Sequence, residues 1–214
     1  CRDWSSDVCS SDLGWIASLQ IPPALREGRE LVVSYNPFTS SWRLISATMH
    51  IRRLFLAICA ISFFWTMGAV LIIIFQPLAK NVLTADKHVL TLMIALFSIG
   101  VAVGSVLINA LLKGHTSAKY APASVLAMGA FIVAFSFLCR DWPAAPHGTL
   151  YDVMTFIEIP RAVLVIVALM GIAVTGGMFV VPLYAFLTTT VTKDQTARTV
   201  AANNVVNAGA MTIG

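Results

Sequence analysis

Three asparagines, Asn203, Asn204 and Asn207, stand near the start of the last apolar stretch of the sequence. Because Asn203 and Asn207 are four residues apart, they lie on one face of a helix. Amide groups in such a place could bind the polar headgroup of a lipid. They could also pin a neighbouring helix through interhelical hydrogen bonds, each of which contributes about 0.6 kcal/mol within a membrane. Both interpretations stay open at this point, and the three residues are candidates for a substrate path.

Gln76 and Trp65 are further candidates for a substrate path and lie in an earlier apolar stretch. Gln76 precedes Pro77, which removes a backbone donor and frees the carbonyl one turn earlier. A helix that breaks beside a cavity would use such a pair, but Gln76 is also close to Lys80 and could simply lie near the outer interface. Trp65, together with the two phenylalanines before it, could line a route for an acyl chain or could face lipid and neighbouring helices.

Charged residues at the ends of apolar stretches are candidates for a gate. Lys113, Asp194 and Arg198 are expected on the same side of the membrane. Salt bridges there could break and re-form as a transporter alternates between its two states. The alternative interpretation is that these charges only set the topology of the chain.

Motifs of enzymes and of metal sites are absent from the sequence. It contains no Gly-rich phosphate loop ending in Lys and Ser or Thr, no His-Glu-x-x-His and no Gly-x-Ser-x-Gly. Cys59 and Cys139 lie within apolar stretches and lack the spacing of a metal site. We therefore expect no catalytic residue, no metal and no cofactor. Nucleic-acid binding is not expected either, because the basic residues follow the loops of a membrane protein rather than one soluble face.

The elements that must position these residues are long apolar helices. Hydrophobic residues make up 58% of the chain and charged residues 11%, whereas soluble domains contain about 25% charged residues. A helix needs about 20 apolar residues to cross the hydrocarbon of a bilayer. The sequence predicts an all-α, polytopic membrane protein, with four complete spans and a fifth that is truncated, at about 54–79, 88–112, 120–139, 162–190 and 199–214. The spacing of Gly100 and Gly104 predicts a close approach of two helices.

The distribution of lysine and arginine predicts the orientation, because cytoplasmic loops carry an excess of both. If the loop 14–53 is cytoplasmic, the loops on that side hold nine lysines and arginines and the loops on the other side hold four. The nine are Arg26, Arg29, Arg43, Arg52, Arg53, Lys113, Lys119, Lys193 and Arg198, and the four are Lys80, Lys87, Arg140 and Arg161. We therefore predict that the loop 14–53 is cytoplasmic.

The first residues differ from all that follow. The segment 3–13 is polar and acidic and resembles the in-frame translation of a common sequencing-library adapter, although a genuine Ser/Asp-rich loop is the alternative. We expect residues 1–13 to be non-native and exclude them from the prediction of the fold. Residues 14–53 then form a connector with several prolines, and residues 54–214 form the membrane-spanning part.

Several segments resemble those of one branch of the major facilitator superfamily. The stretch GWIASLQIPP resembles the end of the sixth helix of that superfamily, and Asn36-Pro37-Phe38 with the residues after it resembles the connector of the branch. ISFFWTMG resembles the start of the seventh helix, KGHTSAKYAP the loop between helices eight and nine, GGMFVVPLYA the tenth helix, and ARTVAANN the start of the eleventh. The branch is the bacterial lysophospholipid transporter family, which includes members fused to an acyltransferase and an acyl-carrier-protein ligase.

This resemblance implies a C-terminal half of a twelve-helix transporter of the bacterial cytoplasmic membrane, cut at both ends. The substrate site would lie at the midplane between this half and an N-terminal six-helix half. The implied function is translocation of lysophospholipid for re-acylation. Proton-coupled efflux of amphipathic compounds and the membrane module of a fused acyltransferase or acyl-ACP ligase are the alternatives. Asn109 stands where the superfamily usually has an acid, so the resemblance does not support a charge latch at that loop.

Overall fold

The computed structural model describes Ser46 and residues 50–113, 117–140, 142–143, 145 and 149–213. The chain divides into two compact units, residues 1–33 and 34–214, and all the described residues belong to the second unit. The predictions for residues 1–13 and for the connector before Ser46 lie outside the described residues. The side chains of Lys193 and Asp194 also lie outside them.

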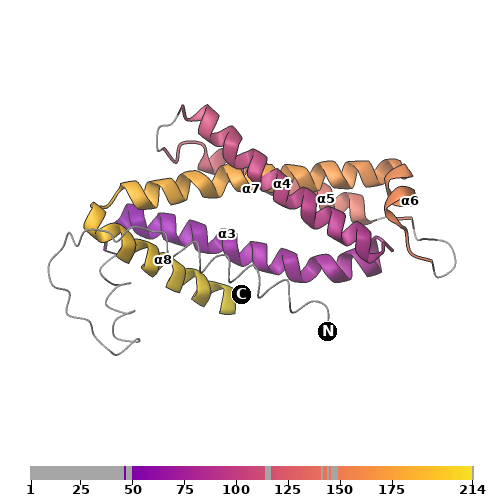
Figure 1. Cartoon of the computed structure of the whole chain (residues 1–214), viewed down its shortest axis with the longest axis horizontal. Coiled ribbons are helices and arrows are strands. Elements are labelled where there is room, and N and C mark those ends of the chain that lie inside the picture. Colours follow the sequence, from indigo (N-terminus) through magenta and orange to yellow (C-terminus); the bar gives the residue numbers. More distant parts are fainter. Residues whose placement is uncertain are drawn as a thin grey trace, which may run out of the picture. The chain divides into compact units, whose positions relative to one another are not determined.

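The described residues are helical and contain no named strand (Figure 1). The helices are α3 (Arg52–Pro77), the π-helix η1 (Leu78–Val82), α4 (Lys87–Leu111), α5 (Ala121–Arg140), α6 (Val153–Glu158), α7 (Pro160–Thr189) and α8 (Lys193–Ile213). Four segments in this part of the chain are long and apolar enough to cross a membrane, namely Arg52–Val82, Lys87–Leu111, Ala121–Arg140 and Pro160–Thr189. The prediction of an all-α, multi-pass membrane protein with four complete spans is therefore confirmed.

The last helix differs from its prediction in two respects. It begins at Lys193, earlier than the predicted residue 199, and it is not apolar enough to count as a fifth span. The physical reason is its polar content, because three asparagines, Gln195 and Arg198 interrupt the apolar pattern. Helix α8 is therefore the most polar of the long helices.

The chain stays helical through Pro77, so the discontinuous helix that one of the two interpretations of Gln76 and Pro77 requires is not observed. The α-helical pattern of α3 ends at Pro77 and the chain continues as the π-helix η1, the kind of irregularity that a missing backbone donor produces. After η1, Thr84 takes a positive φ of 47°. Its carbonyl accepts a hydrogen bond from the backbone N–H of Tyr151, and Asp86 donates from its backbone N–H to the carbonyl of Tyr151. These bonds join the turn between α3 and α4 to the segment before α6.

Acidic side chains cap the first turns of helices α4 and α6. Asp86 accepts hydrogen bonds from the backbone N–H groups of His88 and Val89 at the start of α4. At the start of α6, the Asp152 carboxylate accepts two hydrogen bonds from Thr155, one from its side-chain hydroxyl and one from its backbone N–H. These two bonds lower the pKa of Asp152. The contribution of this cap to stability is therefore present at neutral pH and is lost only as the pH falls through the lowered pKa.

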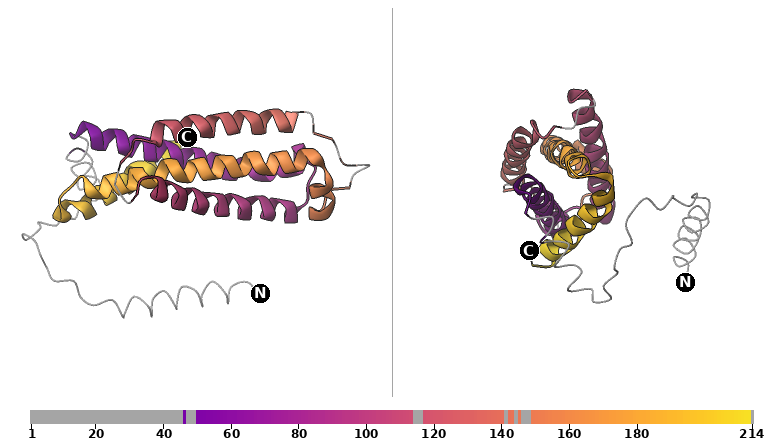
Figure 2. Two further views of the ribbon diagram at one scale, coloured as in Figure 1. Left: turned by 90° about the horizontal axis from the view of Figure 1, so that it is seen from above. Right: turned by 90° about the vertical axis from the view of Figure 1, so that its left-hand side faces the viewer.

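Helix α7 is the central helix of the described part. It packs against α3, α4, α5, α6 and α8, and the end-on view in Figure 2 shows α7 between α4 and α5. In its most apolar stretch 56% of the residues are buried by protein, against 17% to 22% in the other three spans. A helix that is apolar on every side suits this central place.

Helices α4 and α7 approach each other closely enough to bring backbone against backbone. A Cβ atom added at Gly177 would lie 2.5 Å from the carbonyl oxygen of Val101, and one added at Gly100 would lie 2.6 Å from the Cβ of Ala173. At Gly104 the added atom would overlap the backbone of Val174. The prediction that Gly100 and Gly104 allow close packing is therefore confirmed.

We expect Gly104→Ala and Gly177→Ala each to destabilise the fold by about 1–3 kcal/mol, the usual effect of forcing extra atoms into a packed interface. The clash is with backbone, so no side chain can move aside. Gly209→Ala is the matched control, because a Cβ at Gly209 would meet no atom within 4 Å. The measurement is thermal unfolding of the purified protein in detergent, and unchanged stability of Gly104→Ala would contradict the packing.

Candidate functional site

An apolar cavity of about 550 Å³ lies between α3, α4, α5 and α7 and is touched by one residue of α8. Helices α3 and α5 supply most of its wall. The lining residues are Phe63, Phe64, Trp65, Met67, Gly68, Ala69, Leu71, Ile72, Phe97, Ser98, Val101, Val125, Met128, Gly129, Ile132, Ile172, Gly176 and Met211. None of them is charged, and the hydroxyl of Ser98 and the indole N–H of Trp65 are their only polar side-chain groups. The cavity is therefore suited to hydrocarbon.

Aromatic rings form one side of this cavity. Phe64 packs edge-on against Trp65 at a centroid distance of 6.0 Å, and it also lies 6.2 Å from the ring of Phe179. The indole N–H of Trp65 donates a hydrogen bond to the hydroxyl of Tyr184 on α7, at 2.7 Å. Because this bond satisfies the only polar atom of the Trp65 side chain, the ring can face an apolar ligand without leaving a donor unpaired.

Two buried apolar clusters lie on either side of the cavity along the helices. The first, which we call the α6-end cluster, contains Phe75, Leu83, Ala85, Val89, Met93, Cys139, Phe156, Ala162, Val165 and Leu169. The second, which we call the Lys113-end cluster, contains Leu54, Ala57, Ile58, Ile61, Ala121, Phe179, Leu183 and Leu187. On α7, the cavity residues Ile172 and Gly176 fall between Leu169 of one cluster and Phe179 of the other. The cavity is therefore at mid-depth.

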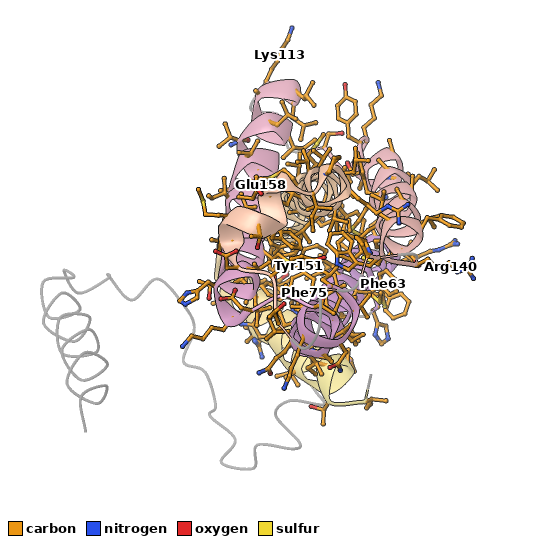
Figure 3. The ribbon with its side chains drawn as sticks, turned by 90° about the vertical axis from the view of Figure 1, so that its right-hand side faces the viewer. Phe63, Phe75, Lys113, Arg140, Tyr151 and Glu158 are labelled. Carbon is orange, nitrogen blue, oxygen red and sulfur yellow. The ribbon has the colours of Figure 1, made fainter. Side chains whose placement is uncertain are left out.

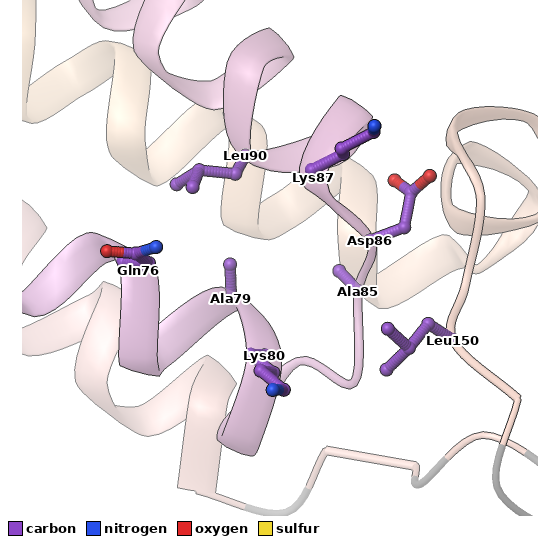
Figure 4. A pocket seen from close by; sticks show the side chains of 8 residues that line it. All are labelled: Gln76, Ala79, Lys80, Ala85, Asp86, Lys87, Leu90 and Leu150. Atoms are coloured by element: carbon purple, nitrogen blue, oxygen red, sulfur yellow. The ribbon is translucent and has the colours of Figure 1, made fainter.

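The structure places Trp65 on the cavity wall but places Gln76 elsewhere. Gln76 is exposed and lines a second hollow of about 420 Å³ at the end of α3, together with Lys80, Asp86 and Lys87 (Figure 4). This position among charged residues agrees with the interpretation that Gln76 lies near an interface. It does not bring Gln76 to the apolar cavity.

The three asparagines of α8 have three different environments. Asn207 is buried and accepts a hydrogen bond from the hydroxyl of Ser62 on α3, at 2.6 Å. Asn203 is fully buried, and neither its amide nitrogen nor its oxygen has a hydrogen-bond partner. Asn204 is exposed. Asn207 therefore joins α8 to α3, as the packing interpretation expects. None of the three asparagines lines the apolar cavity. Their part in a substrate path stays a prediction.

Two of the three gate candidates, Lys113 and Arg198, have side chains that the structure describes. Lys113 extends away from the helices at the end of α4 (Figure 3), and Arg198 is exposed on α8. Neither of them forms an ion pair with another described residue. The side chain of Asp194 lies outside the described residues, so a gate formed by these charges stays a prediction.

Metal-ligating groups do not gather in the part of the chain that the structure describes. No cluster of three or more histidines, cysteines or acids is found there. Cys59 is exposed and Cys139 is buried, and both are free thiols. Neither cysteine lines the apolar cavity.

Three features of this site were not predicted from the sequence. They are two of the three glycines that line the cavity, Gly68 and Gly129, and the hydroxyl of Ser62 that binds Asn207. A lone glycine or serine in an apolar helix carries no signal of its neighbours. The pairing of Ser62 with Asn207 joins residues 145 positions apart, and only the packing of α3 against α8 reveals it.

No protein-family model, no curated protein and no solved structure matches this chain. The fold and the site define a multi-pass α-helical membrane protein with an apolar cavity at mid-depth.

We expect Asn203→Leu to stabilise the protein by about 1–3 kcal/mol, because it replaces a buried amide without partners by an apolar side chain of similar size. Asn207→Leu should instead destabilise it by about 0.6 kcal/mol, the typical value of an interhelical hydrogen bond in a membrane. Thermal unfolding of both variants in the same detergent provides the comparison. A loss of stability in Asn203→Leu would contradict this prediction.

Proposed function

We propose that this protein is a transporter of the major facilitator type that moves a lysophospholipid across the bacterial cytoplasmic membrane for re-acylation. In this proposal the described helices belong to the C-terminal half of a twelve-helix fold, and the loop 14–53 is cytoplasmic. The observation that carries the proposal is the uncharged, aromatic-walled cavity at mid-depth. Its volume of about 550 Å³ falls within the common range for small-molecule sites, roughly 300–1,000 Å³.

The lining of the cavity supports a ligand with an alkyl chain. A charged or strongly polar group, including the headgroup of a lysophospholipid, would lose its hydration inside the cavity without gaining partners, since the lining offers only one hydroxyl and one indole N–H that is already bonded. An acyl chain has no such loss, and its burial is favourable at about 0.8 kcal/mol for each CH₂ group.

The residues that carry the resemblance also contribute to the cavity. The segment 61–68 supplies Phe63, Phe64 and Trp65, and the segment 176–185 supplies Gly176. Tyr184, which holds the indole of Trp65, belongs to the second segment. The resemblance and the cavity therefore point to the same part of the chain, although they are independent observations.

Each alternative has a requirement of its own. Proton-coupled efflux of amphipathic compounds needs an ionisable group within the membrane, and its discriminator is an Asp, Glu or Arg embedded in the first six helices of the fold. A membrane module of a fused acyltransferase or acyl-ACP ligase requires a catalytic domain with its own motif, such as His-x-x-x-x-Asp. The lysophospholipid proposal needs neither.

Uptake of radiolabelled lysophosphatidylethanolamine by cells that express the intact gene product tests this proposal. We expect uptake above that of cells with an empty vector. Ile132→Trp, which fills the cavity, should lower uptake about tenfold, equivalent to about 1.4 kcal/mol of lost binding.

Val133→Trp is the matched control, because Val133 is next in sequence, is exposed on the outside of α5 and does not line the cavity. Its uptake should equal that of the unchanged protein. Absence of uptake by the unchanged protein would contradict the assignment to lysophospholipid transport. Equal uptake by the Ile132→Trp and Val133→Trp variants would contradict the part played by the cavity.

A further inference from the structure

The contact between α3 and α8 satisfies only part of the polar face of α8. Ser62 of α3 donates a hydrogen bond to Asn207. Asn203 lies one turn earlier on the same face of α8 and is 0% exposed, and neither of its amide atoms has a hydrogen-bond partner among the described residues. A buried amide without hydrogen bonds is unfavourable. The observed alignment of the two helices therefore leaves an unsatisfied group inside their packing.

The direction of the two helices determines which residues face each other. Helices α3 and α8 lie side by side and run in the same direction (Figure 1). Residues four apart lie on one face of a helix, and the hydrogen bond between Ser62 and Asn207 sets the alignment. The facing pairs at three successive turns are Ile58 with Asn203, Ser62 with Asn207 and Thr66 with Met211. In the first and third pairs a polar side chain faces an apolar one.

An advance of α8 by one turn along α3 would match these faces better. Four residues of helix correspond to about 6 Å. The facing pairs would then be Ile58 with Thr199, Ser62 with Asn203, Thr66 with Asn207 and Val70 with Met211. Two levels would pair polar with polar side chains and one would pair apolar with apolar. The faces of the two helices are therefore more complementary in the advanced alignment than in the observed one.

Each polar group would have a partner in the advanced alignment. Ser62 would donate to Asn203 as it now donates to Asn207. The hydroxyl of Thr66 donates to the carbonyl of Ser62 at 2.9 Å, and its lone pairs remain free to accept from the amide of Asn207. Thr199 would face Ile58, but a threonine hydroxyl can donate to a carbonyl of its own helix one turn earlier. It therefore needs no partner on α3.

The packing and the connection of α8 permit such a movement. Among the described helices, α8 packs against α3 and less extensively against α7. A Cβ atom added at Gly209 of α8 would meet no atom within 4 Å, in contrast to the backbone contact at Gly104 and Gly177. The first turn of α8, residues 193–196, spans about 6 Å as a helix and up to about 13 Å when extended. Unwinding of this turn therefore supplies enough chain for an advance of one turn.

We propose that α8 has a second register against α3, advanced by one helical turn, in which Ser62 binds Asn203 and Thr66 binds Asn207. One-turn shifts occur between packed helices because packed interfaces have discrete arrangements and do not deform continuously. The second register is a property of this helix pair, and it does not depend on the identity of any transported molecule.

The shift would also change the apolar cavity. Met211 is the residue of α8 that lines it, and the wall that α3 contributes lies between Phe63 and Ile72. In the observed register Met211 is level with Thr66, and in the second register it would be level with Val70. The side chain of Met211 would therefore move about 6 Å along the cavity. The register of α8 is thereby coupled to the space that a ligand can occupy.

Disulfide formation in the intact gene product, in native membranes and without its other cysteines, tests the second register. A disulfide requires Cα atoms within about 7 Å of each other, so each cysteine pair reports one register. Ser62→Cys with Asn207→Cys reports the observed register. Thr66→Cys with Asn207→Cys reports the second register and keeps Ser62 and Asn203 in place. We expect both pairs to form disulfides under a mild oxidant, measured as loss of free thiols in a maleimide gel shift.

Ile58→Cys with Asn207→Cys is the control for direction, because Ile58 lies one turn from Ser62 on the opposite side from Thr66. This pair requires α8 to move backward, which would place Ser62 opposite Met211 and match no polar pair. Its disulfide should form at least about tenfold more slowly than that of the Thr66 pair.

A third substitution in the Thr66→Cys and Asn207→Cys protein tests the hydrogen bond that stabilises the second register. Asn203→Leu should slow disulfide formation about threefold, the factor that corresponds to one interhelical hydrogen bond. Asn204→Leu is the matched control, because it makes the same change at the next residue, which is exposed. Its rate should be unchanged.

The outcomes decide the second register without reference to transport. A faster Thr66 pair than Ile58 pair, slowed by Asn203→Leu, supports the second register even where uptake of lysophospholipid is absent and the proposed function fails. Equal rates for these two pairs indicate undirected sliding and overturn it. No disulfide in the Thr66 pair also overturns it, and no disulfide in the Ser62 pair contradicts the observed packing on which the inference depends.

Discussion

Direct backbone contact between α4 and α7 is the interaction on which the rest of the described structure depends. Within a bilayer, lipid chains are as apolar as the helix surfaces, so hydrophobicity does not drive two helices together and close van der Waals packing must do so. Gly100, Gly104 and Gly177 permit that packing because they have no side chain between the two backbones. The opposite face of α7 receives α5, where the ring of Phe131 lies against Gly171.

The same arrangement explains why a cavity remains. Helix α7 holds α4 and α5 on different sides, and α3 approaches α7 without packing closely against α5. The α6-end cluster and the Lys113-end cluster fill the space at both ends. At mid-depth, Gly68 of α3 and Gly129 of α5 line the remaining space and have no side chain to fill it. The cavity is thus a consequence of how α7 spaces its neighbours.

Polar groups within the membrane are few, and they join helices. Ser62 binds Asn207 to connect α3 with α8, and Trp65 binds Tyr184 to connect α3 with α7. Both bonds start from α3, which has less extensive contact with α7 than α4 and α5 have. Asn203 is the exception, since it is buried without a partner. A buried amide without hydrogen bonds is unfavourable, so Asn203 lowers the stability of the packing around α8.

The sequence by itself determined the fold class, the four spans and the close approach at Gly100 and Gly104, because each depends on local composition or on a spacing along one helix. It also marked Trp65 and the shared face of Asn203 and Asn207. Only the tertiary structure decided that Gln76 lies away from the cavity, that Asn207 has a partner while Asn203 has none among the described residues, and that Gly68 and Gly129 line the cavity while Gly100 and Gly104 pack helices. The reason is that lipid and protein are both apolar surroundings. Hydropathy cannot tell which of the two a side chain meets, and only the packing of helices distant in sequence decides it.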